Sequence, residues 1–259
     1  MEKFLGIKPK SGLYLTDSVK TNIKDNILKK YNVASITPEF VDLDYIYVLL
    51  TTTVNFDSRK TTRTSQTLRS SIINSINTYV SEDLYKFEQT FRLSKLQTKI
   101  DETDSSILGN DSTIRLKKIF TPTLDTKLSY TLRFNNAIYH PHTGHAPALS
   151  STAFSINDEK DVLRDDCKIK DKDSKLLIYR TDNEGKEHTV RENAGTIDYI
   201  TGKVVIDSFD PASYAGNEIS VTVIPVLGDV ASLREQLITI QEKDLNLKMN
   251  DTSFILQKN

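Results

Sequence analysis

The sequence predicts an α+β fold in which a small mixed sheet packs with two to three helices and is followed by a mostly β C-terminal module of hairpins. Three patterns support this fold class. A long alternating run predicts a strand, an amphipathic stretch on either side of it predicts a helix, and short apolar runs separated by turn residues follow residue 167. We therefore expect an α+β domain over 1–137, an irregular linker or insertion over 138–166, and a β-rich module over 167–259.

The long strand is predicted over 45–56, where the odd positions change from aromatic to polar. Its even positions form one apolar stripe, made of Ile46, Val48, Leu50, Thr52, Val54 and Phe56. Because side chains alternate across a strand, this even face is expected to lie on a core. A helix beginning near Thr64 or Ser65 should cover it with Leu68, Ile72, Ile73, Ile76, Tyr79 and Val80.

The first forty residues predict a strand, a helix and a second strand that feeds into the long one. A strand over 4–8 ends at Pro9, and Thr16 is expected to cap a helix that stops at Asn32. Its apolar positions have helical spacing and are Val19, Ile23, Ile27, Leu28 and Tyr31. The run 33–40, interrupted by Pro38, leads into the long strand, so residues 4–56 predict a crossover unit.

The remaining elements are shorter. Ser94 and Gln97 predict a capping box for a third helix. Strands are expected over 113–120, 127–134, 174–181, 188–192, 196–200, 203–207 and 218–226. The last stretch is ambiguous, because Ser232 and Glu235 could cap a helix, whereas the later apolar residues alternate as in a strand, and we favour extended structure.

Composition excludes several classes of function. With 34 basic and 35 acidic residues, the charge gives no reason to expect binding to nucleic acid or to an anionic membrane. The longest apolar run, 45–50, is far shorter than the roughly 20 residues that span a bilayer, and the first ten residues lack the apolar core of a signal peptide. The chain is expected to be cytosolic at synthesis.

No catalytic constellation is evident, so we expect neither catalytic residues nor a cofactor. Glycine-rich phosphate loops and a G-x-S-x-G elbow are absent. Cys167 is the single cysteine and is expected to be a passive small residue. Acidic pairs occur at the predicted edges of elements or in turns, where solvated carboxylates are usual, and involve Asp42 and Asp44, Asp101 and Asp104, Asp165 and Asp166, and Asp171 and Asp173.

One cluster could bind a metal. His140, His142 and His145 lie within six residues of each other, and imidazoles spaced in this way on a loop can converge on zinc or iron. The alternative, which we favour, is an exposed loop that is rich in histidine. Neither a fourth ligand nor an acid placed to act as a base is evident nearby, so any metal would be a structural or inter-subunit clip.

Aromatic residues near the long strand suggest a protein interface instead. We expect Tyr45, Tyr47, Leu68, Ile72, Tyr79, Tyr85 and Phe87 to contribute to partner contacts. The basic run of Arg115, Lys117 and Lys118 alternates with apolar residues and is expected to form the polar face of a half-exposed strand.

The order of several segments resembles a known family. These segments are Lys8–Gly12 before a helix, Val41–Tyr47 opening a long strand, Arg59–Thr64 before the next helix, Phe91–Leu96 before Ile100–Asp101, the hairpin Gly195–Ile206, and Arg234–Ile240. Together they resemble the ring-forming wedge subunit of the baseplate of T-even-like contractile-tailed bacteriophages, within the baseplate J-like group. The similarity covers most of residues 3–250, and the histidine loop lies outside it.

The resemblance implies a structural, non-enzymatic role in the virion tail baseplate, after synthesis in the host cytoplasm. It implies a homodimer within each wedge, contacts with other wedge and hub proteins, and a ring around the tail hub. Family members are much longer, so this chain would match their C-terminal portion. From the residues alone, the alternative is that the C-terminal hairpins form a glycan-binding or host-recognition module.

Overall fold

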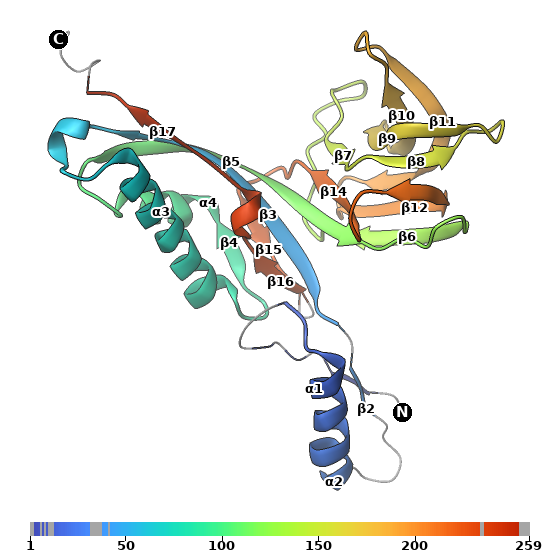
Figure 1. Cartoon of the computed structure of the whole chain (residues 1–259), viewed down its shortest axis with the longest axis horizontal. Helices are drawn as coiled ribbons and strands as arrows, with labels where there is room; N and C mark the ends of the chain where they lie inside the picture. Colours follow the sequence, from blue (N-terminus) through green and yellow to red (C-terminus); the bar gives the residue numbers. More distant parts are fainter. Residues whose placement is uncertain are drawn as a thin grey trace.

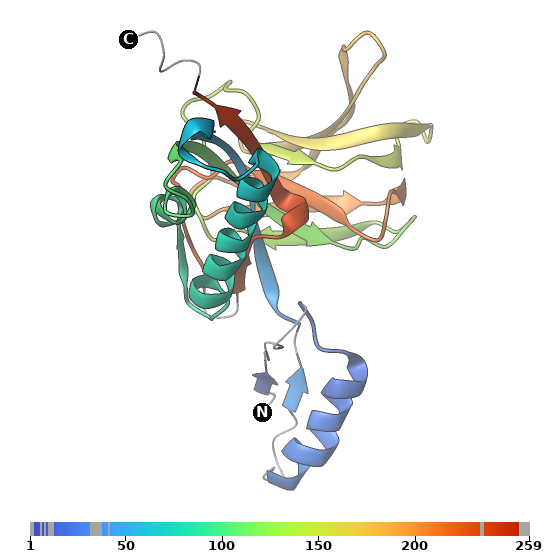
Figure 2. The ribbon, with the colours of Figure 1, turned by 60° about the vertical axis from the view of Figure 1, so that its left-hand side comes forward.

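The computed structural model describes residues 3–5, 7, 9, 13–31, 38–40, 42–233 and 236–253. In this part of the chain, a long mixed sheet carries helices on one face of its first half, and a small N-terminal unit projects from the start of the long strand (Figures 1 and 2). The α+β class with a mostly β C-terminal part is confirmed. No described helix has the length and apolar character needed to span a bilayer.

The N-terminal unit consists of two short parallel strands and one continuous helical segment. Strand β1 pairs in parallel with β2, so the predicted crossover exists, but it closes on Pro38–Phe40 rather than on the long strand. Residues 32–37, which include the predicted helix stop, lie outside the described residues. The elements of this unit are β1 (Lys3–Leu5), α1 (Asp17–Asn22), the π-helical η1 (Ile23–Leu28), α2 (Lys29–Tyr31) and β2 (Pro38–Phe40).

The central layer confirms the long strand and the helix that covers it. Strand β3 buries all its even positions from Ile46 to Phe56, and Ile72 and Ile76 of α3 belong to the same core cluster. Thr64 caps α3 by accepting a hydrogen bond from the backbone N–H of Thr67 at 3.2 Å. The elements are β3 (Asp44–Phe56), η2 (Ser58–Lys60), α3 (Ser65–Tyr79), η3 (Val80–Leu84), β4 (Thr90–Arg92), α4 (Leu93–Asp101) and β5 (Ile107–Phe120).

Two local predictions in these regions are wrong. The predicted capping box does not form, because α4 begins at Leu93, two residues earlier than a helix capped by Ser94, with Arg92 as its N-cap and no side-chain cap. Thr16 is the N-cap of α1, but its side chain does not cap the helix and instead contacts the hydroxyl of Ser18 at 3.1 Å.

The C-terminal half is a series of antiparallel pairs. The run predicted over 188–192 and the first part of the run predicted over 196–200 belong to one strand, β11, which ends at Asp198 and bulges against β10. The elements are β6 (Leu128–Arg133), β7 (Leu149–Ser151), β8 (Phe154–Asn157), β9 (Leu163–Lys172), β10 (Lys175–Thr181), β11 (Glu187–Asp198), β12 (Lys203–Phe209), β13 (Pro211–Tyr214) and β14 (Ile219–Val223). Strands β7, β8 and the start of β9 lie within 138–166, so this segment is not irregular throughout.

The chain then returns to the long strand. Both β16 and β17 pair in parallel with β3, which confirms extended structure over 236–239 and 245–251. Residues 234–235, part of the predicted alternative cap, are outside the described residues. The last elements are β15 (Asp229–Ala231), β16 (Gln236–Thr239), η4 (Glu242–Asp244) and β17 (Leu245–Asp251). Because the sheet runs through both expected domains, the division at 138–166 stays a prediction.

Candidate functional site

The predicted interface residues lie mostly inside the molecule. Five of them are at most 3% exposed, and these are Tyr45, Tyr47, Leu68, Ile72 and Tyr79. A side chain buried within its own chain does not reach a partner, so these five do not themselves form an exposed contact surface. Tyr85 and Phe87 are half-buried, and their interface role stays a prediction.

The aromatic group joins the N-terminal unit to the sheet. The Tyr45 hydroxyl donates to the carbonyl of Leu13 at 2.6 Å, and the Tyr85 hydroxyl donates to that of Pro9 at 3.2 Å. The rings of Tyr14 and Tyr45 meet edge to face, with their centroids 5.5 Å apart. Burial raises the pKa of Tyr45 and of Tyr47 far above the ordinary value, so both phenols stay neutral. The aromatic residues therefore form a contact within the chain, between the N-terminal unit and the sheet, which we call the internal joint.

Two buried lysines correct the prediction of an exposed basic face. Lys117 and Lys118 are 7% and 3% exposed. The Lys117 ammonium pairs with the Asp244 carboxylate, which is also buried, and lies 5.2 Å from the ring centroid of Tyr47. The signal for this was present in the sequence, because consecutive residues of a strand point to opposite faces and two adjacent lysines cannot share the exposed one.

Lys118 belongs to a polar network that links three strands. Its ammonium donates to the Asp44 carboxylate, which also accepts a hydrogen bond from the side-chain amide of Gln236 at 2.5 Å. Gln236 in turn accepts from Asn135 at 2.8 Å. Burial lowers the pKa of Lys118, and the pairing with Asp44 opposes this shift. The network fixes β16 against the start of β3.

The histidine loop brings two of its three histidines together. Nδ1 of His140 contacts Nε2 of His145, and the His140 ring stacks on Tyr199 with centroids 4.0 Å apart. His142 is exposed, contacts the carbonyl of Thr143 at 3.0 Å through its ring nitrogen, and has its ring edge to face with that of His145, with centroids 6.3 Å apart. Among the described residues, no group of three or more His, Cys, Asp or Glu side chains is arranged to hold a metal ion.

Acidic residues of all four pairs make structural contacts. The buried Asp171 accepts from the Tyr199 hydroxyl at 2.7 Å and from the backbone N–H of Leu149 at 2.7 Å, which connects the turn after β11 and the start of β7 to β9. Comparable contacts involve Asp42 with Lys20, Asp101 with Asn110, Asp104 with Ser106, Asp165 with Ser155, and Asp173 with Gly144. Cys167 is fully buried, and burial raises the pKa of its thiol to about 11, so the reactive thiolate is disfavoured.

The helix over 17–31 carries the most prominent exposed apolar stripe in the N-terminal unit. Neither α1 nor η1 contains a buried residue, and Val19 and Ile27 are 42% and 52% exposed. The stripe lies on one face of the helix because its residues are spaced four apart, at Val19, Ile23 and Ile27. The segment projects away from the sheet in both views (Figures 1 and 2).

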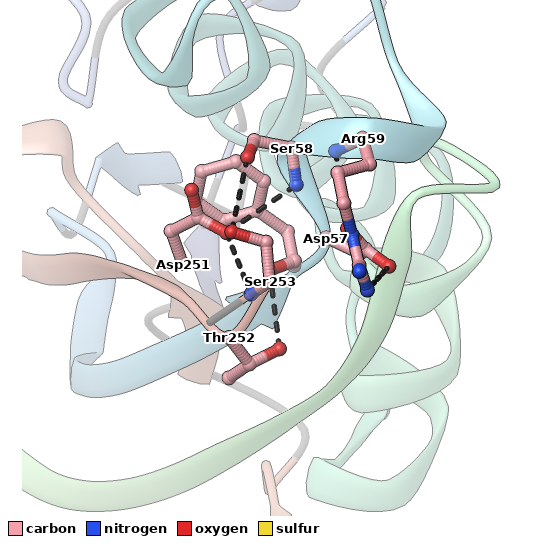
Figure 3. Close-up of polar contacts among 7 residues, drawn as sticks. Asp57, Ser58, Arg59, Asp251, Thr252 and Ser253 are labelled. Carbon is pink, nitrogen blue, oxygen red and sulfur yellow. Dashed lines mark hydrogen bonds and ion pairs between the residues drawn. The ribbon is translucent and has the colours of Figure 1, made fainter. Parts of the chain in front are cut away.

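A second exposed feature is the edge of the sheet at β17. Hydrogen bonds hold the C-terminal end of this strand beside the end of β3 (Figure 3). The Asp251 carboxylate accepts from the backbone N–H of Ser58 at 3.3 Å and of Ser253 at 3.0 Å. Beside it, Arg59 makes two hydrogen bonds of 3.0 Å with the buried Asp57 carboxylate. Hydrogen bonding from Ser58, and then from Ser253, lowers the pKa of Asp251 to about 2.

This lowered pKa predicts a specific acid dependence. A lowered folded-state pKa stabilises the fold above the unfolded-state value of 3.8, and this stabilisation is lost as the pH falls from about 4 to about 2. Asp251→Asn keeps an acceptor oxygen but removes the charge, so we expect a shallower loss of unfolding free energy across that range. Urea unfolding at several pH values measures it, with Asp111→Asn on the exposed face of β5 as the control. If the unfolding free energy of Asp251→Asn depended on pH as steeply as that of the wild type between pH 2 and 4, the lowered pKa could not be assigned to Asp251.

In the described residues, these polar and ionisable groups hold elements of the chain in place. Comparison with known proteins identifies related sequences. Residues 2–41 match the family model "Baseplate structural protein gp6, C-terminal domain I", and residues 44–118 match domain III of the same protein. The first match covers the N-terminal unit, and the second begins at β3.

A curated relative supports the same assignment. The chain is 30% identical over 216 residues to "Baseplate wedge protein gp6" of Enterobacteria phage T4, which is 83% of this chain and 30% of the length of that relative. The chain therefore belongs to the baseplate wedge family and corresponds to its C-terminal part, as the resemblance predicts. It is a structural component of the virion tail baseplate.

Proposed function

We propose that this chain is an architectural subunit of the baseplate wedge that forms a dimer, contacts other wedge and hub proteins, and joins neighbouring wedges into a ring around the tail hub, without catalysing a reaction. The observation that carries this proposal is the exposed apolar stripe of the helix over 17–31. Three elements in the N-terminal half carry an apolar face, namely the first helix, α3 and β3, and the last two use theirs in the core of the chain itself. The first helix is the one whose apolar side chains remain at the surface.

An apolar helical stripe of this kind is suited to another protein surface. Val19 and Ile27 are separated by two helical turns, so a groove or a second helix can bury both at once. Basic and acidic residues flank the stripe, with Lys20 paired to Asp42 at 2.7 Å and Lys29 paired to Asp25 at 2.7 Å. An apolar centre with a polar rim is the usual composition of a protein interface.

The proposal predicts the effect of charge on this stripe. Val19→Glu combined with Ile27→Glu is expected to weaken self-association, or binding to a neighbouring baseplate subunit, by at least about tenfold, because two carboxylates would have to be desolvated. Since both side chains are already exposed, the unfolding free energy should change by about 0.5 kcal/mol or less. Light scattering measures the first effect and urea unfolding the second.

Thr21→Glu adds the same type of charge at an exposed position on the opposite side of the helix and is the control. Equal binding by the double variant and the control would contradict the role of the stripe. A dilute wild-type sample that stays monomeric and binds no neighbouring baseplate subunit would contradict the proposed function as a whole.

No specific observation favours the alternative of a glycan-binding module. The cavity of about 390 Å³ beside β9, β10 and β11 is lined by charged, polar and leucine side chains, without an aromatic ring for a sugar to stack on. Binding of the C-terminal half to host cell surfaces would nevertheless favour that alternative over the architectural role.

A further inference from the structure

Strand β17 forms a regular edge of the sheet in the described part of the chain. It pairs with β3 in one unbroken parallel register from Leu245 opposite Leu50 to Asp251 opposite Phe56, without a bulge. Within the described residues, no other strand pairs with it. The preceding strand on the same side of β3, β16, is buried at all four residues, so β17 is the exposed part of this edge (Figures 1 and 2).

The direction of its backbone groups follows from one hydrogen bond. The N–H of Thr252 donates to the carbonyl of Phe56 at 2.9 Å, immediately after the pair of Asp251 with Phe56. Because alternate residues of a strand direct both backbone groups to the same side, the even residues of β17 face β3 and the odd ones face outward. The N–H and C=O groups of Leu247 and Met249 therefore point away from β3, and no backbone partner for them occurs among the described residues.

The side chains of β17 also separate into two kinds. Leu245, Leu247 and Met249 lie on the face that packs against the main core, where Leu247 is buried and the other two are half-buried. Asn246, Lys248 and Asn250 lie on the other face and are exposed. An added strand would therefore need apolar side chains on one face and polar, uncharged or acidic ones on the other.

The sequence of the edge meets this requirement itself. In an antiparallel pair of two β17 strands centred on Leu247, each Leu245 lies opposite Met249 of the second copy and each Asn246 lies opposite its Lys248. Centring on Lys248 would place two lysines opposite each other. Centring on Met249 would place Leu247 opposite Asp251. Only the first of these registers keeps one face apolar and opposes no like charges.

We propose that the exposed edge of β17 pairs antiparallel with β17 of a second copy of this chain, about a two-fold axis at Leu247. This inference rests on the proposed self-association and adds a second contact surface to the stripe of the first helix. The outward backbone groups of Leu247 and Met249 supply the hydrogen bonds of the pair, as in other cases of strand addition. Because the same edge is used by both copies, the pairing closes and leaves no edge of β17 open for further growth.

Three substitutions at exposed positions test the register. Asn246→Asp places a carboxylate opposite Lys248 of the second copy twice per dimer, and should tighten the dimer by roughly 2- to 30-fold. Asn246→Lys opposes two lysines and should weaken it by a similar factor. Asn250→Lys adds the same charge outside the paired residues 245–249 and is the matched control, expected to change the dimer by less than about twofold. Sedimentation equilibrium of the full chain at low salt measures the dissociation constants.

Amide hydrogen exchange gives a second readout that does not depend on substitution. On dilution below the dissociation constant, the N–H groups of Leu247 and Met249 should lose protection, whereas that of Lys248, which faces β3, should keep it. If neither substitution at Asn246 changes the dissociation constant of the dimer, the proposed β17 pairing is wrong, although self-association itself is not contradicted. A strictly monomeric chain overturns both. The N–H groups of Leu247 and Met249 could instead become protected only when another baseplate subunit is added. In that case the β17 edge binds that subunit, and the proposed pairing with a second copy of this chain is wrong.

Discussion

Replacing Lys117 with methionine is expected to lower the free energy of unfolding by about 3–5 kcal/mol, because it leaves the Asp244 carboxylate buried without its cation. The side chains of Lys117 and Asp244 are only 9% and 7% exposed, so water cannot replace the missing partner. Oδ2 of Asp244 already has no hydrogen-bond partner, which makes the remaining ion pair more important. Urea unfolding followed by circular dichroism measures the change.

Two further variants separate loss of the ion pair from loss of packing. The double change Lys117→Met with Asp244→Leu removes both charges and should recover a large part of the lost stability, because buried ion pairs are often replaceable by apolar residues of similar size. Lys175→Met, at an exposed end of β10, is the control and should stay within about 0.5 kcal/mol of the wild type. A loss below about 1 kcal/mol for the single variant would mean that water reaches Asp244.

This ion pair illustrates what the sequence could and could not predict. Alternation located β3, and helical spacing located α3, because each pattern is local and is set by one apolar face. The partner of Lys117 lies 127 residues further along the chain, in η4, and nothing in the local pattern of either residue indicates the other. The adjacency of the two lysines could have indicated that one of them is buried, but only the pairing of β17 and β16 with β3 places Asp244 beside Lys117.

The candidate contact surfaces also show what could and could not be predicted from the sequence. The aromatic residues near β3 resembled an interface in composition, yet burial assigns Tyr45 and Tyr47 to the joint with the N-terminal unit. Composition alone does not distinguish an internal joint from an external interface, because both bury large rings with a polar end. Conversely, the spacing of Val19 and Ile27 indicates only an ordinary amphipathic helix. The sequence does not show that the rest of the chain leaves this apolar face uncovered. The edge of β17 was visible as alternation, but its open side became apparent only from the order of strands.

Ile76→Ala is expected to destabilise the protein by about 2–5 kcal/mol, because its side chain is completely buried where α3 packs in the main core. The adjacent Asn77 is exposed on the same helix, and Asn77→Ala should be neutral or slightly stabilising because alanine favours helix. Urea unfolding of both variants compares the buried and exposed faces directly. If the α3 face instead served a partner and stayed outside the core, Ile76→Ala would leave the isolated chain within about 0.5 kcal/mol of the wild type and would weaken only assembly. A large loss in the isolated chain therefore excludes the α3 face as an assembly surface and is consistent with assembly through the first helix and the β17 edge.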